Sequence, residues 1–277
     1  MNNPAMSLTR IPMPDRLRDQ AENPPAEPVA PKDASTIVVV RDGADGIEAY
    51  LMRRQTTMAF AAGFYVFPGG GVLPEDYRSV PWIGPDESVW AERWNTDIDR
   101  ARALVVAAVR ETFEETGILL AGPDESTVLA DTTELEPLRG ALEAREVMFR
   151  DVLLERGLSL RADLLGAWAH WITPAFEPRR YDTRFFVAAL PQGQVVGTMS
   201  GEADRATWAP LSKVLAAIDA GEASMMPPTI ATCREVARHS AAEIVAVAAD
   251  RTFPTIEPRL VVDGDELFLE TYLGEKP

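Results

Sequence analysis

The sequence predicts an α+β fold in which strands and helices mix around a shared core. β-branched runs separated by turn residues occur early in the chain, and long apolar helical segments follow them. The two kinds of element do not alternate in the regular order of a doubly wound parallel sheet, and no internal repeat is evident. With 277 residues, 46% of them hydrophobic, the chain is long enough to bury such a core.

The first part of the chain is expected to be a tail followed by strands. Seven prolines among polar neighbours in the first 31 residues predict a mobile tail over residues 1–34, followed by a single domain over 35–277. Two β-branched runs flank a turn of Asp and Gly residues, which is typical of a β-hairpin. The predicted strands cover residues 36–41, 47–53 and 63–67, and Pro68 and the glycines after it end the third.

Helices are predicted for the middle of the chain. Thr96 suits an N-cap position, and Gly117 and Gly157 suit the left-handed conformation that ends many helices. The predicted helices cover a short stretch after Pro85, residues 96–116 and residues 134–156.

The rest of the chain predicts strands and helices together, closed by a hairpin. Apolar and β-branched runs indicate the strands, and Ser212 suits the N-cap of the first helix. The Asp-Gly-Asp turn at 263–265 is typical of a hairpin. The predicted strands cover residues 166–172, 183–190, 259–262 and 266–272, and the predicted helices cover 213–220, 229–239 and 241–249.

Charge and cysteine content limit the partners and the setting of the protein. The formal net charge is −16, and such an acidic surface repels nucleic acids and anionic membranes, so we expect neither as a partner. An anionic substrate would need metal cations or a local basic patch at its site. The single cysteine, Cys233, excludes a disulfide framework and cysteine-rich zinc sites. Because no signal or membrane-spanning pattern occurs either, we expect a cytoplasmic protein.

Three glutamates on one predicted helix carry the chemistry. Glu111, Glu114 and Glu115 stand at i, i+3 and i+4, which places them within an arc of roughly 100° on the helix. Carboxylates so close together repel one another. Hard divalent cations relieve this repulsion, because Mg²⁺ and Mn²⁺ prefer carboxylate oxygens and also bind phosphates. The spacing therefore predicts a platform for a metal ion.

The alternative is an acidic helix face in contact with solvent or with basic side chains. Residues 103–109 are apolar nearly all round, so this helix is expected to be buried. Buried carboxylates need partners, and we favour the metal platform for that reason.

A glycine-rich segment precedes the helix. Gly69, Gly70 and Gly71 follow a predicted strand, and such a run lets the backbone approach a phosphate or a metal without interference from a side chain. As a plain loop the segment would need no explanation. Together with the glutamate helix it predicts a site between loop and helix.

These residues together resemble the Nudix box, written G-x5-E-x7-R-E-U-x-E-E-x-G-U with U aliphatic. Gly70 is followed by Asp76 six residues later and then by the run that begins at Arg110. Phe113 takes the place of an aliphatic residue. Asp76 stands where the box has glutamate, and residues 77–109 separate it from Arg110 where the box has seven residues.

Both departures resemble the coenzyme A and acyl-coenzyme A diphosphatases, a branch whose nudix-motif-nineteen-like members carry an insertion in the box. Other stretches are similar to that branch, namely residues 51–54, 63–70, 171–174, 180–186 and 226–229. The resemblance implies a Nudix-type α/β/α sandwich around a mixed β-sheet, with helical additions. It also implies a box insertion at about 77–100, rich in tryptophan, and a C-terminal helical and hairpin addition at about 225–277. Whether the insertion covers the site as a lid or buries a contact in a homodimer stays open.

The resemblance also implies roles for the box residues, with Mg²⁺ or Mn²⁺ as cofactor. Glu111 and Glu115 would be metal ligands, with Glu114 and the carbonyl of Gly70 as further ligands. Arg110 would orient a glutamate or only neutralise the cluster. Asp76 would be a remote ligand or a turn residue. The general base would be Glu111 or a carboxylate from another loop, with Glu202 as a weaker candidate.

The implied substrate is a nucleotide-derived diphosphate, which Arg53, Arg54, Tyr181 and the backbone of Gly69 and Gly70 would contact. The alternatives are a solvent position for one of the two arginines and packing in the core, which is favoured, for Tyr181. For coenzyme A or acyl-coenzyme A the products would be adenosine 3′,5′-bisphosphate and an (acyl-)4′-phosphopantetheine. The alternative substrates are ADP-ribose, a dinucleotide or a nucleotide sugar. A sensor module without catalysis is a further alternative, but such modules usually lack box glutamates, and all three are present here.

Overall fold

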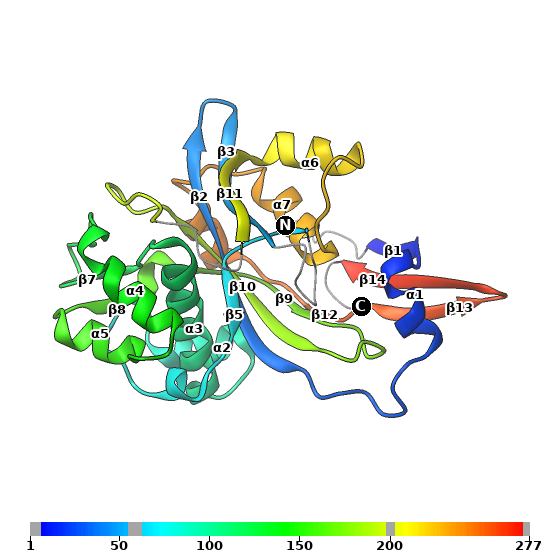
Figure 1. The fold of residues 1–277 in the computed structure, drawn as a ribbon, viewed down its shortest axis with the longest axis horizontal. Helices are drawn as coiled ribbons and strands as arrows, with labels where there is room; N and C mark the ends of the chain where they lie inside the picture. Colours follow the sequence, from blue (N-terminus) through cyan, green and yellow to red (C-terminus); the bar gives the residue numbers. More distant parts are fainter. Residues whose placement is uncertain (1–6, 55–62, 198–202, 274–277) are drawn as a thin grey trace.

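The computed structural model describes residues 7–54, 63–197 and 203–273, and its centre is a mixed eight-stranded sheet (Figure 1). The main path of the sheet runs β11-β3-β2-β10-β9-β12, with β4 paired to β3 and β5 paired to β2. The strands are β2 (Lys32–Gly43), β3 (Gly46–Arg54), β4 (Tyr65–Val66), β5 (Gly69–Gly71), β9 (Gly166–Ile172), β10 (Tyr181–Ala189), β11 (Ala203–Pro210) and β12 (Thr255–Ile256). β10 is parallel to β2, whereas β3 is antiparallel to β2, so the predicted hairpin and mixed sheet are confirmed.

Helices cover both faces of this sheet, in the sandwich arrangement that was expected (Figure 1). Side chains of β2 alternate between the faces, because successive residues of a strand point to opposite sides. Ile37 and Val39 pack with the first helical layer, and Val38 and Val40 pack with the second. The first layer holds α2 (Glu87–Trp94), α3 (Ile98–Thr116), α4 (Glu136–Glu143) and α5 (Phe149–Glu155). The second layer holds α6 (Leu211–Asp219), α7 (Pro227–Val236) and α8 (Ile244–Asp250).

The N-terminal segment, which was expected to be a mobile tail over residues 1–34, contributes a strand and a helix from Ser7 onward, and residues 1–6 lie outside the described residues. β1 (Ser7–Pro12) pairs with β14 (Glu266–Leu273), which also pairs with β13 (Arg259–Asp263) in the predicted closing hairpin. The helix α1 (Asp15–Glu22) then packs against this three-stranded sheet. The apolar side chains that hold it are Met13, Leu17, Ala21, Phe176 and Leu269. The high proline content of the segment gave no indication of these apolar contacts, because the partner residues lie far away in the sequence.

The predicted helix over 134–156 is divided in two in the structure. α4 ends at Glu143, and Arg145 adopts a left-handed conformation with φ of 59° before α5 begins. A non-glycine residue in that region of backbone space turns the chain, so the helix cannot continue. Gly157, with φ of 61°, ends α5 as expected.

The tryptophan-rich insertion is part of the core of the first helical layer. Trp90 and Trp94 on α2 are each 3% exposed, and both rings pack against Phe186 of β10. A small third sheet, ordered β6-β8-β7, borders this layer and consists of β6 (Trp82–Ile83), β7 (Ala121–Gly122) and β8 (Ser159–Arg161). The insertion therefore supports the main sheet from the side of α3. Within the described ranges, no helix is both long and apolar enough to cross a lipid bilayer.

Candidate active site

Helix α3 is fixed in position at its start and along its length. Its N-cap is Asp97, whose side chain accepts a hydrogen bond from the Arg100 amide, so the cap lies one residue beyond the predicted Thr96. Gly117 ends the helix with φ of 75°, as the sequence predicts. The Ser35 hydroxyl on β2 donates to the carbonyl of Leu104 at 2.7 Å in the buried interface between strand and helix. These contacts fix how close the glutamates of the last two helical turns lie to the sheet.

The glycine segment forms the strand β5, which lies directly against these glutamates. The amide of Gly69 donates to Oε2 of Glu115 at 2.7 Å. Gly70 leaves no space for a side chain, because a Cβ atom there would lie 2.5 Å from Cδ and Oε1 of Glu111. Gly69 approaches β2 equally closely, since a Cβ would stand 2.4 Å from the Ser35 carbonyl oxygen. The segment was expected to be a turn, and its pairing with β2 is what brings it to the helix.

Arg110 connects the two halves of the site. Its Nε and Nη2 atoms each donate to the Asp76 carboxylate at 2.9 Å, and Nη2 also donates to the Gly71 carbonyl at 3.0 Å. Its Nη1 atom donates to Glu111 at 2.8 Å and to Glu114 at 3.2 Å. One guanidinium thus links Asp76, which stands at the first acidic position of the box, with the glycine strand and two helix glutamates.

Asp76 lies in the short 3₁₀ helix η1 (Pro74–Tyr77) and is 1% exposed. Besides binding Arg110 with both oxygens, it accepts the Leu73 amide at 2.8 Å. The sequence left two roles open for Asp76, remote metal ligand or turn residue. The structure adds a third role, because Asp76 binds Arg110 and holds it in place. The insertion loops out between Asp76 and α3 without separating them.

Negative charge exceeds positive charge in this group. Asp76, Glu111, Glu114 and Glu115 are carboxylates, and Arg110 is the cation that three of them share. Burial raises the pKa of Glu111 to about 7, although the positive charge of Arg110 opposes the rise. Burial also raises the pKa of Glu114, again against Arg110. Oxygen donors with such an excess of buried charge fit a divalent cation, which would compensate it.

The carboxylates do not yet converge on one point. Among the residues that the structure describes, no three acidic, imidazole or thiol groups are already arranged to hold a metal ion. The reason lies in their partners, because Arg110 engages Glu111 and Glu114 while the Gly69 amide engages Glu115. Binding of a cation would therefore require these side chains to turn toward one another.

Two of the expected substrate contacts lie on the opposite face of the sheet. Arg53 follows Leu51 by two residues on β3, so it shares the face of Leu51, which packs with the second helical layer. Tyr181 shares the face of Phe185 and Val187 on β10, which also belongs to that layer. Neither side chain therefore lies on the sheet face that α3 covers, and their contact with a substrate stays a prediction. The side chain of Arg54 and all of Glu202 lie outside the described residues.

Several supporting residues were missed in the sequence. Arg100 in the first turn of α3 donates to Asp33 through Nε at 2.9 Å and to Asp182 through Nη2 at 2.8 Å. The Asp33 carbonyl also accepts the Val72 amide at 3.0 Å, just beyond the glycine strand. Ser35 is a polar residue inside an apolar strand, and that was the available signal. Asp33 gave no comparable signal, because acidic residues at the start of a strand are ordinary surface residues.

Comparisons with known proteins agree with this geometry. A family model described as the NUDT19 Nudix domain matches residues 86–238, a range that includes the three helix glutamates. The crystal structure of a NUDIX hydrolase from Alicyclobacillus acidocaldarius superposes with a TM-score of 0.61 at 33% identity, covering 78% of this chain and 95% of that one.

Curated relatives that carry the name acyl-coenzyme A diphosphatase NUDT19 include one from Xenopus laevis and one from Homo sapiens. The one from Xenopus laevis is 25% identical over 198 aligned positions, covering 58% of this chain and 52% of that protein. The one from Homo sapiens is 26% identical over 277 aligned positions, covering 82% of this chain and 74% of that protein. The match therefore spans about half the length of the Xenopus relative and about three quarters of the human one.

Proposed function

This chain belongs to the Nudix hydrolases, in the family of the NUDT19 Nudix domain, and from that premise we propose that it hydrolyses the diphosphate of coenzyme A or an acyl-coenzyme A. The observation that carries the proposal is the close approach of the helix glutamates to the glycine strand, where the Gly69 amide donates to Glu115 and Gly70 has no room for a side chain beside Glu111. The names of the two curated relatives support the choice of substrate.

In the proposed reaction, water attacks one phosphorus of the diphosphate and the bridging P–O bond breaks. The water oxygen remains on the phosphate that was attacked, and the other phosphate leaves with the bridging oxygen. The products are adenosine 3′,5′-bisphosphate and 4′-phosphopantetheine, or its acyl form. Glu111, or a carboxylate from another loop, accepts the proton that the water loses.

Nudix hydrolases generally use divalent metals, and the residues of this site fit one. We propose that Glu111, Glu114 and Glu115 hold Mg²⁺ or Mn²⁺, with the Gly70 carbonyl as a further ligand. A cation bound there would lower the pKa of the attacking water and neutralise charge on the phosphoryl oxygens. Asp76 orients Arg110, and Arg110 in turn fixes the positions of Glu111 and Glu114.

The test is a substrate panel with the purified protein. Coenzyme A, an acyl-coenzyme A, ADP-ribose and NADH are each incubated with Mg²⁺ or Mn²⁺, and the products are separated by chromatography. We expect the highest kcat/KM for coenzyme A or the acyl-coenzyme A. Preferential turnover of ADP-ribose or NADH would reject the proposed substrate, and no turnover of any compound would reject the proposed activity.

Isotope labelling adds a mechanistic control to the same assay. In H₂¹⁸O, one ¹⁸O atom should appear in one phosphate product and none in the other, because a single P–O bond is cleaved. Glu115→Gln is the matched inactive variant, and Glu146→Gln changes an exposed glutamate outside the site. We expect Glu115→Gln to lower kcat by orders of magnitude while Glu146→Gln retains it.

A further inference from the structure

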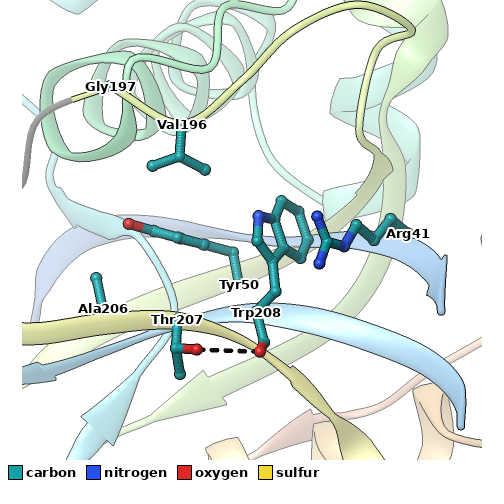
Figure 2. Close-up of a pocket in the computed structure, with 7 residues that line it drawn as sticks. All are labelled: Arg41, Tyr50, Val196, Gly197, Ala206, Thr207 and Trp208. Atoms are coloured by element: carbon teal, nitrogen blue, oxygen red, sulfur yellow. Dashed lines mark hydrogen bonds between the residues drawn. The ribbon is translucent and has the colours of Figure 1, made fainter. Parts of the chain in front are cut away.

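A pocket lies beside the candidate active site, on the same face of the sheet as α3. It has a volume of about 460 Å³, within the range of roughly 300–1,000 Å³ typical of small-molecule sites. Its lining includes Tyr50 on β3, Trp208 and its neighbours on β11, and Val196 in the loop after β10 (Figure 2). Neither the family resemblance nor the proposed chemistry assigns a role to this pocket.

The pocket adjoins the glutamates through the chain segments that form its wall. The Gly197 amide donates to the Thr116 carbonyl at 2.8 Å, which anchors the loop of Val196 at the end of α3, next to Glu115. Burial raises the pKa of the Tyr50 hydroxyl, and the charge of Glu115 adds to the rise, which is consistent with their proximity. A substrate with its diphosphate at the glutamates could therefore extend one end into this pocket.

The aromatic side chains of the pocket are held in fixed positions. The rings of Tyr50 and Trp208 meet edge to face, with centroids 5.4 Å apart. The Arg41 guanidinium lies over the indole of Trp208, 4.5 Å from its centroid, and Arg41 is itself held by Glu48 at 2.8 Å. Figure 2 shows Tyr50 and Trp208 on the side of the sheet that Val196 faces. Rings fixed in this way lose little entropy when a ligand binds.

The composition of the wall favours a flat heteroaromatic ring over an aliphatic chain. Aromatic faces stack on nucleobases whatever the base, and indole and phenol groups also offer polar atoms at their edges. An acyl chain would instead be matched by flexible aliphatic side chains, whereas Thr207 and Arg41 contribute polar groups here.

We propose that this pocket binds the purine base of the substrate, with Trp208 as the main stacking surface and Tyr50 beside it. The inference rests on the proposed function, because it assigns the adenosine half of that substrate to one side of the glutamates. The pantetheine half would then leave the site in the other direction.

The experiment measures binding of the two product halves by isothermal titration calorimetry. The probes are adenosine 3′,5′-bisphosphate and 4′-phosphopantetheine, titrated into the wild type, Trp208→Ala and Ala206→Leu. Ala206→Leu fills part of the pocket without removing its aromatic side chains, so it decides the outcome if Trp208→Ala does not fold. Trp82→Ala is the matched control, since Trp82 lies on β6 in the small β6-β8-β7 sheet and does not line the pocket.

We expect both pocket variants to raise the Kd of adenosine 3′,5′-bisphosphate about 5- to 100-fold, the range of a lost base stack. The Kd of 4′-phosphopantetheine should stay unchanged, and Trp82→Ala should bind both probes as the wild type does. An unchanged Kd for adenosine 3′,5′-bisphosphate in Ala206→Leu, or weaker binding of 4′-phosphopantetheine alone, would overturn the assignment.

The failure of this inference is distinguishable from failure of the proposed function. If the wild type cleaves coenzyme A and Ala206→Leu does so with the same KM, the pocket assignment is rejected and the function stands. If the wild type cleaves no diphosphate but binds adenosine 3′,5′-bisphosphate in a manner that depends on Trp208, the function is rejected and the pocket assignment stands.

Discussion

Asp76 binds Arg110 with both carboxylate oxygens, each at 2.9 Å, in an interior where both side chains are at most 3% exposed. The residues are 34 positions apart in the sequence, and the insertion lies between them along the chain. This ion pair joins the two parts of the Nudix box in spite of the insertion. Aspartate is shorter than the glutamate of the box, but it still reaches the arginine.

Asp76→Asn should therefore reduce stability and activity together. The substitution removes the negative charge that two Arg110 nitrogens contact in the interior, which costs up to about 3–5 kcal/mol of unfolding free energy, because Glu111 and Glu114 still offset part of the arginine charge. The freed guanidinium would shift toward Glu111 and Glu114, so kcat should fall at least about tenfold. Urea denaturation and steady-state kinetics measure the two effects. Asp99→Asn is the control, because Asp99 is 73% exposed in its pair with Arg102 and should cost less than about 1 kcal/mol.

Gly70→Ala should separate activity from stability. The new Cβ would overlap the end of the Glu111 side chain, which is flexible enough to move away, so the fold should survive while the carboxylate is displaced. We expect kcat to fall about 10- to 100-fold, in line with a displacement near 1 Å, and Tm to change little. Gly71→Ala is the matched control, since its nearest neighbour would be 3.9 Å away. Full activity in Gly70→Ala would argue against a role for the Glu111 position.

Trp94→Ala tests whether the insertion belongs to the core. Loss of a buried ring packed against Phe186 should cost about 3–5 kcal/mol. Val89→Ala on the same helix changes a residue that is 43% exposed and should cost less than about 0.5 kcal/mol. If Trp94→Ala left the unfolding free energy intact and altered only KM, the insertion would act as a lid instead.

The stability of the protein in EDTA should depend on the ionisation of Glu111. Burial raises its pKa from 4.5 to about 7 in the folded state. The folded protein thus holds this proton more tightly than the unfolded chain does. The contribution of this bound proton to the free energy of unfolding is fully present below pH 4.5 and is lost as the pH rises to about 7. The loss is on the order of 3 kcal/mol.

Mg²⁺ should reverse that loss, because it binds the ionised carboxylate. Calorimetry should show a larger rise of Tm with Mg²⁺ at about pH 7.5 than at about pH 5. Glu111→Gln removes the titrating group and should abolish most of the difference. An equal rise at both pH values in the wild type would show that the cation binds elsewhere.

Local patterns in the sequence predicted the parts of the fold and site that depend on local geometry. The spacing of Glu111, Glu114 and Glu115 defines one side of α3 whatever the rest of the chain does. The left-handed conformation at Gly117 follows from glycine itself. The hairpin of β2 and β3 follows from its turn residues. Each of these features is determined within a few residues.

Features that depend on distant partners were missed. β1 pairs with a strand some 260 residues later, and no property of its own sequence indicates that partner. The break at Arg145 uses a left-handed conformation that arginine rarely adopts, so its sequence gives no warning. Arg53 was expected at the site because it lies at a strand end that leads toward the glycines, and Tyr181 was expected either to contact the substrate or to pack in the core. The alternation of side chains along β3 and β10, once the buried neighbours are known, places both on the other face.

The central claim is that the α3 glutamates jointly hold a divalent cation beside the glycine strand. Mn²⁺ binding, followed by electron paramagnetic resonance in the wild type and in Glu115→Gln, tests it most directly. We predict that the wild type binds Mn²⁺ and that Glu115→Gln, with an unchanged circular dichroism spectrum, binds it at least about tenfold more weakly. Equal affinity in the two folded proteins would contradict the account.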